Sequence, residues 1–315
     1  MLSIVIVTRN TQELLGGLLT SIRQDTSLQP LLREIVVVDN ASSDGTGQLV
    51  KETFPEVLYL KNIENRGFAA AANQGSALAT GDFLLFLNSD TRLLPGEVEK
   101  VLFFMKDDAT IAIAGPQLVY EDMRPQRSCA DAPSLLLEVA PFLVPAFRFR
   151  AGYGLRQATS SSPSDVESVI GAAMFVSAQV MRVLEGFDEG FFFFLEETDF
   201  CVRARQGGYR VLFFPSARVI HLQGKTVRQT WVKGRIEYAI SLYKFIRKYH
   251  SDAYYKTFVL VRVVKSLLFL FVATLLPFLL LSESTRRKYS YYGRLLLWHI
   301  KGRPDDAGLR SSSLK

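Results

Sequence analysis

The chain has 315 residues, 48% of them hydrophobic, and its mean hydropathy is +0.14. This length suits one large domain or a domain with an appendage, and the hydropathy calls for a search for a membrane segment. Two cysteines, Cys129 and Cys201, exclude the disulfide framework of a small secreted protein and indicate a reducing compartment. The first apolar run is too short for a signal peptide and follows no basic stretch, so we expect the chain to fold in the cytoplasm.

The formal net charge of +6 is unevenly distributed along the chain. Residues 1–221 carry 19 Lys and Arg against 26 Asp and Glu, a balance of −7, whereas residues 222–315 carry 18 against 5, a balance of +13. A basic tail on an acidic body suggests a membrane surface or nucleic acid as the partner of the tail. The apolar sequence within the tail favours the membrane and argues against nucleic acid.

The first hundred residues alternate between strand and helix patterns. β-Branched, apolar runs typical of strands buried on both faces are followed by segments with apolar residues at helical spacing. This alternation predicts an α/β fold with a mostly parallel sheet, in which ligands bind at the carboxyl ends of strands. We expect strands at 2–7, 34–38, 56–61 and 82–88, and helices at 12–24, 46–53, 67–79 and 95–106.

The middle of the chain has a weaker pattern. Residues 120–165 contain four spaced prolines and the sequence "TSSSPS", which predict loops. A strand-like segment at 166–177 precedes a short helix at 178–184. A further helix is expected at 198–206, ended by Gly207 and Gly208, and a last strand at 210–215.

Residues 266–281 form an uncharged apolar run of 16 residues, shorter than the roughly 20 that a membrane-spanning helix needs. We expect a marginal span, a re-entrant helix broken at Pro277 or a helix lying in the membrane interface; a buried C-terminal hairpin is the alternative. Basic residues and Tyr and Trp flank the run, which favours both ends on the cytoplasmic side. We therefore divide the chain into an α/β domain, 1–250, and a membrane-association segment, 251–315.

Polar residues follow several of the predicted strands. Asp39 could accept hydrogen bonds from a base or ribose, although taken alone an Asx turn or helix cap explains it better. Gly67, in "NRGF", permits a close backbone approach, and the helix after it could face a phosphate or simply pack on the sheet. Asp90, in "NSD", could bind Mg²⁺ or Mn²⁺ beside substrate phosphates, or form part of a strand-to-helix turn.

Two further features could carry chemistry. Glu196, Glu197 and Asp199 follow the apolar run "FFFFL", and desolvation with close like charges would raise a carboxyl pKa and make a better base. The alternative is a helix start, where the dipole favours acids. His221 lies just beyond the last predicted strand and suits a metal or phosphate contact, although a lone His is more often structural.

Taken together, these segments resemble the family 2 glycosyltransferases of the GT-A fold, and most closely the rhamnosyltransferase-type members of bacterial polysaccharide assembly. The resemblance covers roughly residues 2–250, and the order and spacing of the motifs make it specific. It implies a Rossmann-like α/β domain with a mixed, mostly parallel sheet flanked by helices. The motifs are "SIVIVTRN", "IVVVDNASSDGT", "NRGFAAAANQG", "FLLFLNSDT", "GAAMFVS", "GFDEGFFFFLEETDFCVRARQGGYRV" and "VIHLQG".

The resemblance assigns residues to the donor site. Thr8, Asn10 and Asp39 would line the nucleotide pocket, with Asp39 facing the base. Asn65 and Gly67 would lie near the nucleotide and the diphosphate.

The resemblance also implies a metal site. Asn88, Ser89 and Asp90 stand at the family's Asp-X-Asp position, with Asp90 as the ligand of Mg²⁺ or Mn²⁺. Asn88 replaces the first Asp, which removes one charge from the site. His221 matches a position that binds the metal or the diphosphate in relatives.

The catalytic assignment rests on the same resemblance. "EETD" stands in place of the family's Glu-Asp-X-Asp, which makes Glu197 the base, in place of the usual Asp. Glu196 and Asp199 would shape the acceptor pocket. The expected reaction is the inverting transfer of a sugar from a nucleoside-diphosphate sugar to a hydroxyl of a glycan or polyprenyl-linked glycolipid. The resemblance to rhamnosyltransferases suggests rhamnose as that sugar.

The expected localisation is the cytoplasmic face of the inner membrane, where the protein would take part in the assembly of a cell-surface polysaccharide. Two other classes stay open from the residues alone. A nucleotidyltransferase would be expected to carry a Gly-rich basic loop after its first strand, which "TRNTQELL" lacks. A sugar-nucleotide-binding membrane subunit without catalytic activity is the other, since Asn88 and Glu197 depart from the family pattern.

Overall fold

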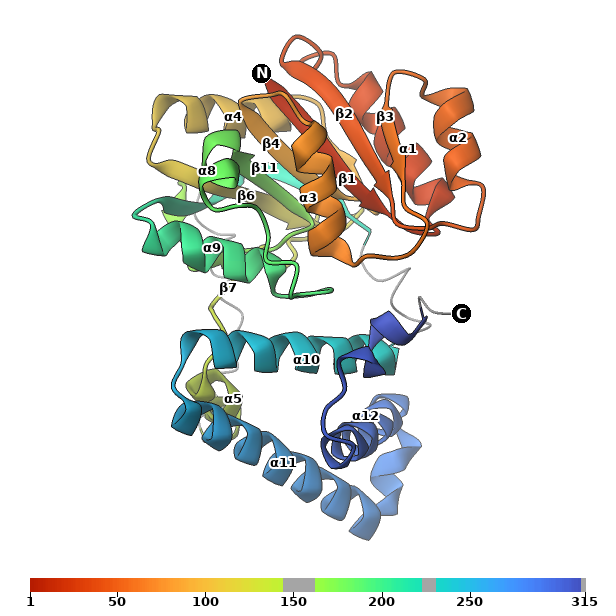
Figure 1. Ribbon diagram of the computed structural model, residues 1–315, viewed down its shortest axis with the longest axis vertical. Coiled ribbons are helices and arrows are strands. Elements are labelled where there is room, and N and C mark those ends of the chain that lie inside the picture. Colours follow the sequence, from red (N-terminus) through yellow and green to blue (C-terminus); the bar gives the residue numbers. More distant parts are fainter. Residues whose placement is uncertain (144–161, 223–230, 313–315) are drawn as a thin grey trace. The chain divides into compact units, whose positions relative to one another are not determined.

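The computed structural model describes residues 1–143, 162–222 and 231–312 (Figure 1). By their internal contacts these residues form two compact units. The first, here called the α/β unit, comprises residues 1–132, 162–190 and 196–222; the second, the helical unit, comprises residues 133–143, 191–195 and 231–312. The functional boundary expected after residue 250 stays a prediction.

A mixed sheet of nine strands forms the centre of the described α/β unit. Its main path runs β3-β2-β1-β4-β10-β6-β11-β5, and β8 pairs with β11 outside that path. β10, β5 and β8 run antiparallel to their neighbours, and all other pairs in the sheet are parallel, so the predicted mixed, mostly parallel sheet is confirmed. The strands are β1 (Leu2–Thr8), β2 (Leu32–Asp39), β3 (Leu58–Lys61), β4 (Phe83–Asn88), β5 (Thr91–Leu93), β6 (Ile111–Val119), β8 (Ser164–Asp165), β10 (Ala173–Ser177) and β11 (Arg210–His221).

The helices of the α/β unit lie where the periodicity predicts them, within two residues at either end. α4 begins later than expected because Gly96, in a left-handed conformation at φ 76°, precedes its first turn. A separate two-stranded sheet joins β7 (Cys129–Ala130) to β9 (Ser168–Val169). The helices are α1 (Gln12–Gln24), α2 (Thr46–Thr53), α3 (Phe68–Leu78), α4 (Glu97–Asp107), α8 (Ala178–Val183) and α9 (Glu196–Gln206).

Both faces of the sheet are covered, which explains why its central strands are apolar throughout. The apolar sides of α1 and α4 pack with Ile4 and Ile6 of β1 into one large core cluster. On the opposite face, α3 packs so closely on β1 that a Cβ added at Gly75 would lie 2.4 Å from Val5 Cγ1. The sheet is therefore a rigid support, and its carboxyl edge fixes the side chains that follow the strands.

Three expectations for the α/β unit were incomplete. The fully buried strand β6 and the short strand β5 were not predicted. The segment 166–177, expected as one strand, is divided into β9 and β10. The stretch 120–165, predicted as loops, contains β7, β8 and, in the helical unit, α5 (Leu135–Leu143). Residues 144–161 of that stretch lie outside the described residues.

The end expected for the last strand at 215 was wrong, since β11 continues to His221. Pro215 lacks an N–H, and the ladder with β6 accordingly skips from Phe214 to Arg218 through a bulge before pairing resumes. His221 is thus the last residue of the strand and is held in register with its neighbours.

The helical unit contains two long helices joined by a short 3₁₀ segment. α11 ends just before Pro277, where the sequence predicted a break, and α12 returns alongside it. A buried ion cluster links α5 to α11: Glu138 contacts Lys265 Nζ at 2.8 Å and Arg262 Nη1 at 3.2 Å. The elements are α5, α10 (Trp231–Tyr249), α11 (Asp252–Leu275), η2 (Pro277–Leu281), α12 (Glu283–Ile300), η3 (Asp305–Ala307) and η4 (Leu309–Ser312).

One side of α11 is an exposed apolar surface. Among the described residues, α11 is the one helix long and apolar enough to cross a membrane, yet only 22% of its most apolar stretch is buried in the protein. α11 and α12 form a hairpin, but its apolar side is not buried as the alternative expectation required. The exposed apolar side chains are Leu260, Val264, Leu267, Leu268, Phe271, Val272, Leu275, Leu276, Phe278 and Leu281.

Candidate active site

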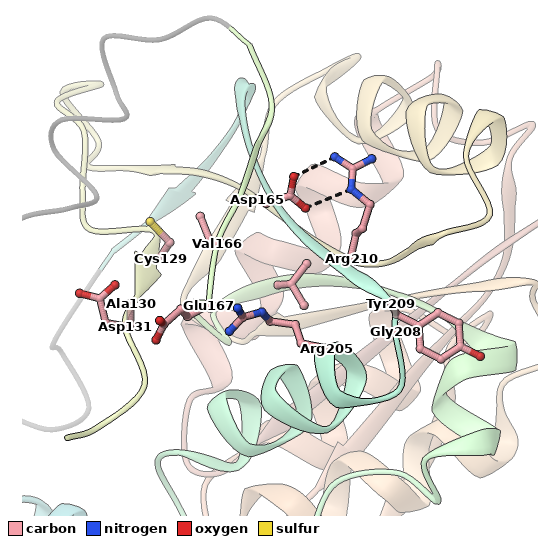
Figure 2. A pocket seen from close by; sticks show the side chains of 11 residues that line it. Cys129, Ala130, Asp131, Asp165, Val166, Glu167, Arg205, Gly208, Tyr209 and Arg210 are labelled. Carbon is pink, nitrogen blue, oxygen red and sulfur yellow. Dashed lines mark hydrogen bonds and ion pairs between the residues drawn. The ribbon is translucent and has the colours of Figure 1, made fainter.

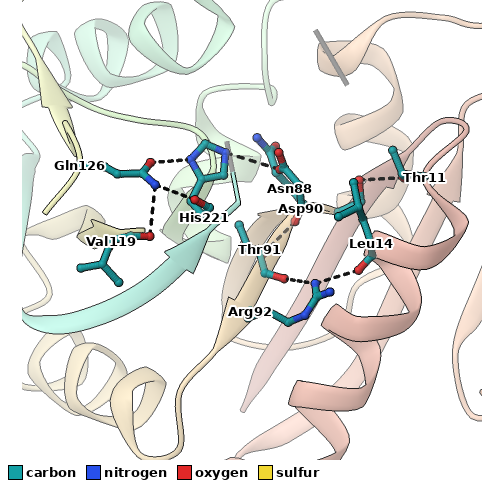
Figure 3. Close-up of polar contacts among 10 residues, drawn as sticks. Thr11, Leu14, Asn88, Asp90, Thr91, Arg92, Val119, Gln126 and His221 are labelled. Atoms are coloured by element: carbon teal, nitrogen blue, oxygen red, sulfur yellow. Dashed lines mark hydrogen bonds and ion pairs between the residues drawn. The ribbon is translucent and has the colours of Figure 1, made fainter. Parts of the chain in front are cut away.

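Asp90 and His221 meet at the carboxyl edge of the sheet, although 131 positions separate them in the sequence (Figure 3). The antiparallel pairing of β5 with β11 sets His221 opposite Thr91, the residue after Asp90. Leu222 N–H donates to the Asp90 carbonyl at 2.9 Å and closes the turn. As a result His221 Nε2 lies 3.5 Å from Asp90 Oδ1, with both side chains largely buried.

Gln126 fixes the orientation of the His221 ring. Its Nε2 donates to the carbonyls of His221 at 2.6 Å and Val119 at 3.2 Å, so its Oε1 must face His221 Nδ1, 3.0 Å away. An amide oxygen only accepts, so Nδ1 carries the hydrogen. In a neutral ring Nε2 then presents its lone pair to Asp90, and a cation or a proton between the two groups makes that contact favourable.

This pair fits a divalent cation that is bound partly by substrate. Among the residues that the structure describes, no three His, Cys, Asp or Glu side chains gather in a group able to hold a metal ion. Asp90 and His221 would supply two ligands, and hard cations such as Mg²⁺ and Mn²⁺ can complete their shell with phosphate oxygens and water. The orientation of His221 by Gln126 is the kind of support that metal-bound histidines usually have.

A line of buried hydroxyl groups connects the ends of β1 and β4. Thr8 Oγ1 lies 2.7 Å from Thr11 Oγ1, which donates to Ser89 Oγ at 2.9 Å. Asn88 is held by its backbone, since its N–H donates to the Ala172 carbonyl and its own carbonyl accepts from Thr91 Oγ1. Thr8, Asn88 and Ser89, all expected at the donor site, are thus brought to one edge of the sheet.

Asp39 is fully buried at the end of β2 and is satisfied within the protein. Ser42 N–H donates to its Oδ1 at 2.7 Å, and the Tyr59 hydroxyl donates to its Oδ2. Burial, together with the hydrogen bond to Asp39, raises the pKa of Tyr59 well above its ordinary value, so this phenol stays protonated. Asn10, which follows β1 and has φ 52°, contacts the loop after β2, because its Oδ1 accepts a hydrogen bond from Ser43 N–H at 2.8 Å.

Asn40 organises the segment that carries Asn65 and Gly67. Its Nδ2 donates to Asn65 Oδ1 at 2.7 Å and to the Gly67 carbonyl at 2.9 Å, and its Oδ1 accepts from Arg66 N–H at 3.0 Å. Gly67 has φ 84° and ψ 172°, a conformation that is essentially restricted to glycine. The segment is therefore fixed in front of α3, whose first N–H groups point out of the helix.

Glu197 lies in the first turn of α9 and packs against the backbone of Gly171. A Cβ on Gly171 would sit 3.4 Å from Glu197 Cβ, so a larger side chain there would crowd the carboxylate. The next residue, Ala172, accepts from Asn88 N–H at 3.0 Å. Glu197 is connected in this way to the strand end that carries the Asn88–Asp90 turn.

The other two acids of α9 are buried. Asp199 Oδ2 accepts from Arg203 Nε at 2.8 Å, and the same guanidinium donates to the carbonyls of Leu184 and Gly186. Through Arg203, Asp199 is therefore connected to the residues that follow α8. Glu196 is 6% exposed at the helix start, where the helix dipole favours a carboxylate.

A pocket of about 440 Å³ lies elsewhere in the α/β unit (Figure 2). It is lined by residues 129–131, 165–167 and 208–211, with Arg205, and includes the ion pair of Arg210 with Asp165. Arg210 begins β11 and His221 ends it, a separation of roughly 36 Å along the strand. None of the residues that line this pocket is among those predicted for the donor, metal or catalytic site.

The structure adds three residues that the sequence did not single out: Gln126, Asn40 and Tyr59. Asn40 and Tyr59 lie in or beside motifs that were recognised, and their polarity next to buried strands was an available signal. Gln126 lies in the proline-rich stretch predicted as loops, and no periodicity marks it.

The sheet order, with the antiparallel strand β10 between the parallel strands β4 and β6 and polar groups at the carboxyl edge, defines a GT-A glycosyltransferase fold. A model of "Glycosyl transferase family 2" matches residues 3–156, and one of "Glycosyl transferase family group 2" matches residues 83–300. The chain belongs to the family 2 glycosyltransferases and is rhamnosyltransferase-like, as the motifs predicted.

Two relatives from Mycobacterium tuberculosis match most of the chain. N-acetylglucosaminyl-diphospho-decaprenol L-rhamnosyltransferase is 24% identical over 233 residues, which cover 69% of this chain and 75% of that protein. Pre-mycofactocin glycosyltransferase is 28% identical over 241 residues, covering 75% of this chain but only 45% of that protein.

Two solved structures share the fold. The mannosyltransferase PcManGT from Pyrobaculum calidifontis, in complex with GDP-Man and Mn²⁺, aligns with a TM-score of 0.60 and 18% identity over 95% of this chain and 86% of that one. GalNAc-T7 with UDP, GalNAc and Mn²⁺ aligns with a TM-score of 0.55 and 20% identity, over 70% of this chain and 43% of that one.

Proposed function

We propose that this glycosyltransferase moves a sugar from a nucleoside-diphosphate sugar to a hydroxyl of a glycan or polyprenyl-linked glycolipid, with inversion and with a divalent cation. The observation that carries the proposal is the meeting of Asp90 Oδ1 and His221 Nε2 at 3.5 Å. Two electron-pair donors facing each other beside polar strand ends suit a cation bridged to a diphosphate. Similarity to the M. tuberculosis rhamnosyltransferase supports a glycolipid acceptor, and similarity to two glycosyltransferase structures with Mn²⁺ supports the divalent cation.

The donor would lie along the carboxyl edge of β1, β2 and β4. Thr8, Asn10 and Asp39 are assigned to the nucleoside, with the Asp39 carboxylate held ready by Ser42 and Tyr59. Asn65 and Gly67 are assigned to the diphosphate side, before the amino end of α3. A helix amino end carries partial positive charge and free N–H groups, both of which favour phosphate.

Asp90 and His221 would hold the cation, and Asn88 and Ser89 would line the site beside it. A bound divalent cation neutralises charge on a leaving nucleoside diphosphate. Asn88 adds an amide instead of a carboxylate, so the protein ligands contribute one negative charge in place of two. We expect the cation to bind firmly only when the diphosphate is present.

Glu197 is the proposed base. Its carboxylate takes the proton of the acceptor hydroxyl while that oxygen attacks the anomeric carbon from the face opposite the nucleotide. The C–O bond to the acceptor forms as the bond to the diphosphate breaks, and the diphosphate leaves as an anion without a general acid. Glu196 and Asp199 are assigned to shaping the acceptor side through α9.

The segment 251–315 would hold the enzyme at the cytoplasmic face of the inner membrane, where a polyprenyl-linked acceptor is presented. The exposed apolar side of α11 and the excess of basic residues support this placement. Binding at the surface raises the effective concentration of acceptor at the site. Basic residues at both ends of the apolar run favour a helix that lies in the interface over one that crosses.

A thermal-shift panel of nucleoside-diphosphate sugars, with and without Mn²⁺, tests the proposal. A ligand at 100 times its dissociation constant stabilises the folded chain by about 2.7 kcal/mol. The true donor should raise the melting temperature more with Mn²⁺ than without it. Release of inorganic diphosphate instead of a nucleoside diphosphate during turnover would indicate a nucleotidyltransferase, and binding without any transfer would indicate a non-catalytic subunit.

A further inference from the structure

The helical unit contains a pocket of about 460 Å³ between the carboxyl end of α10, the first half of α11 and Arg303. Three cations line it, Arg247, Lys256 and Arg303, against the single carboxylate of Asp252. Asp252 lies 3.9 Å from Lys256 Nζ, and both side chains are mostly exposed, so this pair neutralises little. The pocket therefore carries a surplus of positive charge.

Tyr255 holds the two guanidinium groups in place. Arg247 and Arg303 both lie over its ring, with their Cζ atoms 5.7 and 5.8 Å from the ring centre, and Arg303 Nη1 donates to its hydroxyl at 2.7 Å. Among the described residues, neither arginine has a carboxylate within ion-pair distance. Two fixed guanidinium groups with spare N–H donors are suited to the planar, bidentate contacts that a phosphate accepts.

The remaining wall of the pocket is apolar and is formed by Val259, Leu260 and Val263 of α11. Leu260 is 62% exposed, and the exposed apolar surface of α11 continues from it through Leu267 and Phe271 to Leu275. The exposed apolar residues between Leu260 and Leu275 lie on one side of α11, and α10 and α12 also pack against this helix. α11 therefore fits an orientation along the membrane surface, with the pocket at one end of its apolar side.

We propose that this pocket binds the phosphate headgroup of an anionic membrane phospholipid, whose acyl chains lie against the exposed apolar side of α11. The inference rests on the proposed location of the enzyme at the membrane and adds a defined site to it. A soluble phosphate ligand would use the cations but not the apolar wall and its exposed continuation. Charge complementarity and the amphipathic lining together favour the lipid.

The test is binding of the full chain to vesicles of phosphatidylcholine alone and of phosphatidylcholine with phosphatidylglycerol, measured by co-sedimentation. The wild-type chain should bind both and prefer the anionic vesicles. Each basic residue near an anionic surface contributes roughly fivefold to affinity, so Arg247→Gln with Lys256→Gln and Arg303→Gln should lower binding to the anionic vesicles about 100-fold. Binding to phosphatidylcholine should change little.

A charge-conserving variant separates a built site from diffuse attraction. Arg247→Lys with Arg303→Lys keeps the net charge but loses the stacking on Tyr255 and the bidentate donors, and should still cost roughly fivefold on anionic vesicles. The matched control is Arg287→Lys with Arg294→Lys, two exposed positions on α12 outside the pocket, which should bind as the wild type does. Circular dichroism melting confirms that each variant is folded.

Equal binding of the Arg247→Lys, Arg303→Lys variant and the wild type would overturn the headgroup site, while leaving membrane association intact. Binding of inorganic phosphate by the wild-type chain in solution, lost in the Arg247→Lys, Arg303→Lys variant while its binding to anionic vesicles is unchanged, would assign the pocket to free phosphate instead. If the wild-type chain binds neither kind of vesicle, the membrane placement fails as well. The donor-binding panel is independent of all three outcomes and tests the glycosyltransferase itself.

Discussion

Replacing Gln126 by Leu should weaken metal binding without touching a proposed ligand. The substitution removes the acceptor of the His221 Nδ1 hydrogen, 3.0 Å away, and frees the ring to turn or to move its hydrogen to Nε2. Either change removes the lone pair that faces Asp90. Loss of such a supporting contact typically lowers metal affinity about 10- to 100-fold, which corresponds to roughly 1.4–2.7 kcal/mol.

The assay is a calorimetric titration of Mn²⁺ into the chain in the presence of a saturating nucleoside diphosphate. Gln126→Leu also removes the donor that Gln126 supplies to the Val119 and His221 carbonyls, so unfolding by urea must be measured in parallel. Gln117→Leu is the matched control. Gln117 is an equally buried glutamine that donates three hydrogen bonds, one of them to the Gln126 carbonyl, and has no hydrogen bond to the His221 ring.

We expect Gln126→Leu to lose Mn²⁺ affinity in the stated range and Gln117→Leu to keep it, even if both lose stability. A folded Gln126→Leu chain that binds Mn²⁺ as tightly as the wild type would refute the reasoning. Equal losses in the two variants would show that general destabilisation, and not the orientation of His221, controls the site.

Three further outcomes are expected. First, burial alone would raise the pKa of Glu138, but the positive charges of Arg262 and Lys265 outweigh burial and lower that pKa. The ion cluster should therefore stabilise the helical unit fully above the ordinary pKa of 4.5, and this stabilisation should be lost as the pH falls through the lower folded-state pKa. Glu138→Gln should lower the free energy of unfolding in urea by about 3–5 kcal/mol. Unchanged stability of that variant would contradict the cluster. Second, because Mg²⁺ prefers oxygen ligands, Mn²⁺ should bind more tightly than Mg²⁺, and His221→Ala should abolish this preference in competition titrations; a preference that survives the substitution would exclude His221 as a ligand. Third, Gly67→Ala should destabilise the chain by about 1–3 kcal/mol and weaken nucleotide binding, because φ 84° with ψ 172° suits only glycine; a neutral thermal shift would argue against that geometry.

The order of the first strands and helices could be predicted because a doubly covered parallel sheet leaves a simple sequence pattern. "IVIV" and "FLLFL" are apolar at every position because helices cover both faces of the sheet. The later strands were harder to predict. β6 contains Gly115 and Pro116, and β11 is interrupted by Pro215, so their sequences do not read as continuous strands even though pairing continues around a bulge.

The metal site shows a similar limit. Asp90 and His221 were expected from motifs, but the 3.5 Å contact depends on the pairing of β5 with β11, and three residues of β5 carry too little sequence signal to predict it. Gln126 reaches His221 only through tertiary structure, so no local pattern could mark it. The roles given to Glu197, Asp39 and the other site residues stay predictions that the experiments above and below address.

The most direct test of the central claim is the turnover of Glu197→Gln with the donor that stabilises the wild-type chain. The account predicts a fall in kcat of about 10²- to 10⁴-fold, the usual contribution of a general base, with donor affinity unchanged in the thermal-shift assay. Glu185→Gln, an exposed acid twelve positions earlier in the chain, should behave as the wild type does. Near-normal turnover of Glu197→Gln would contradict the account.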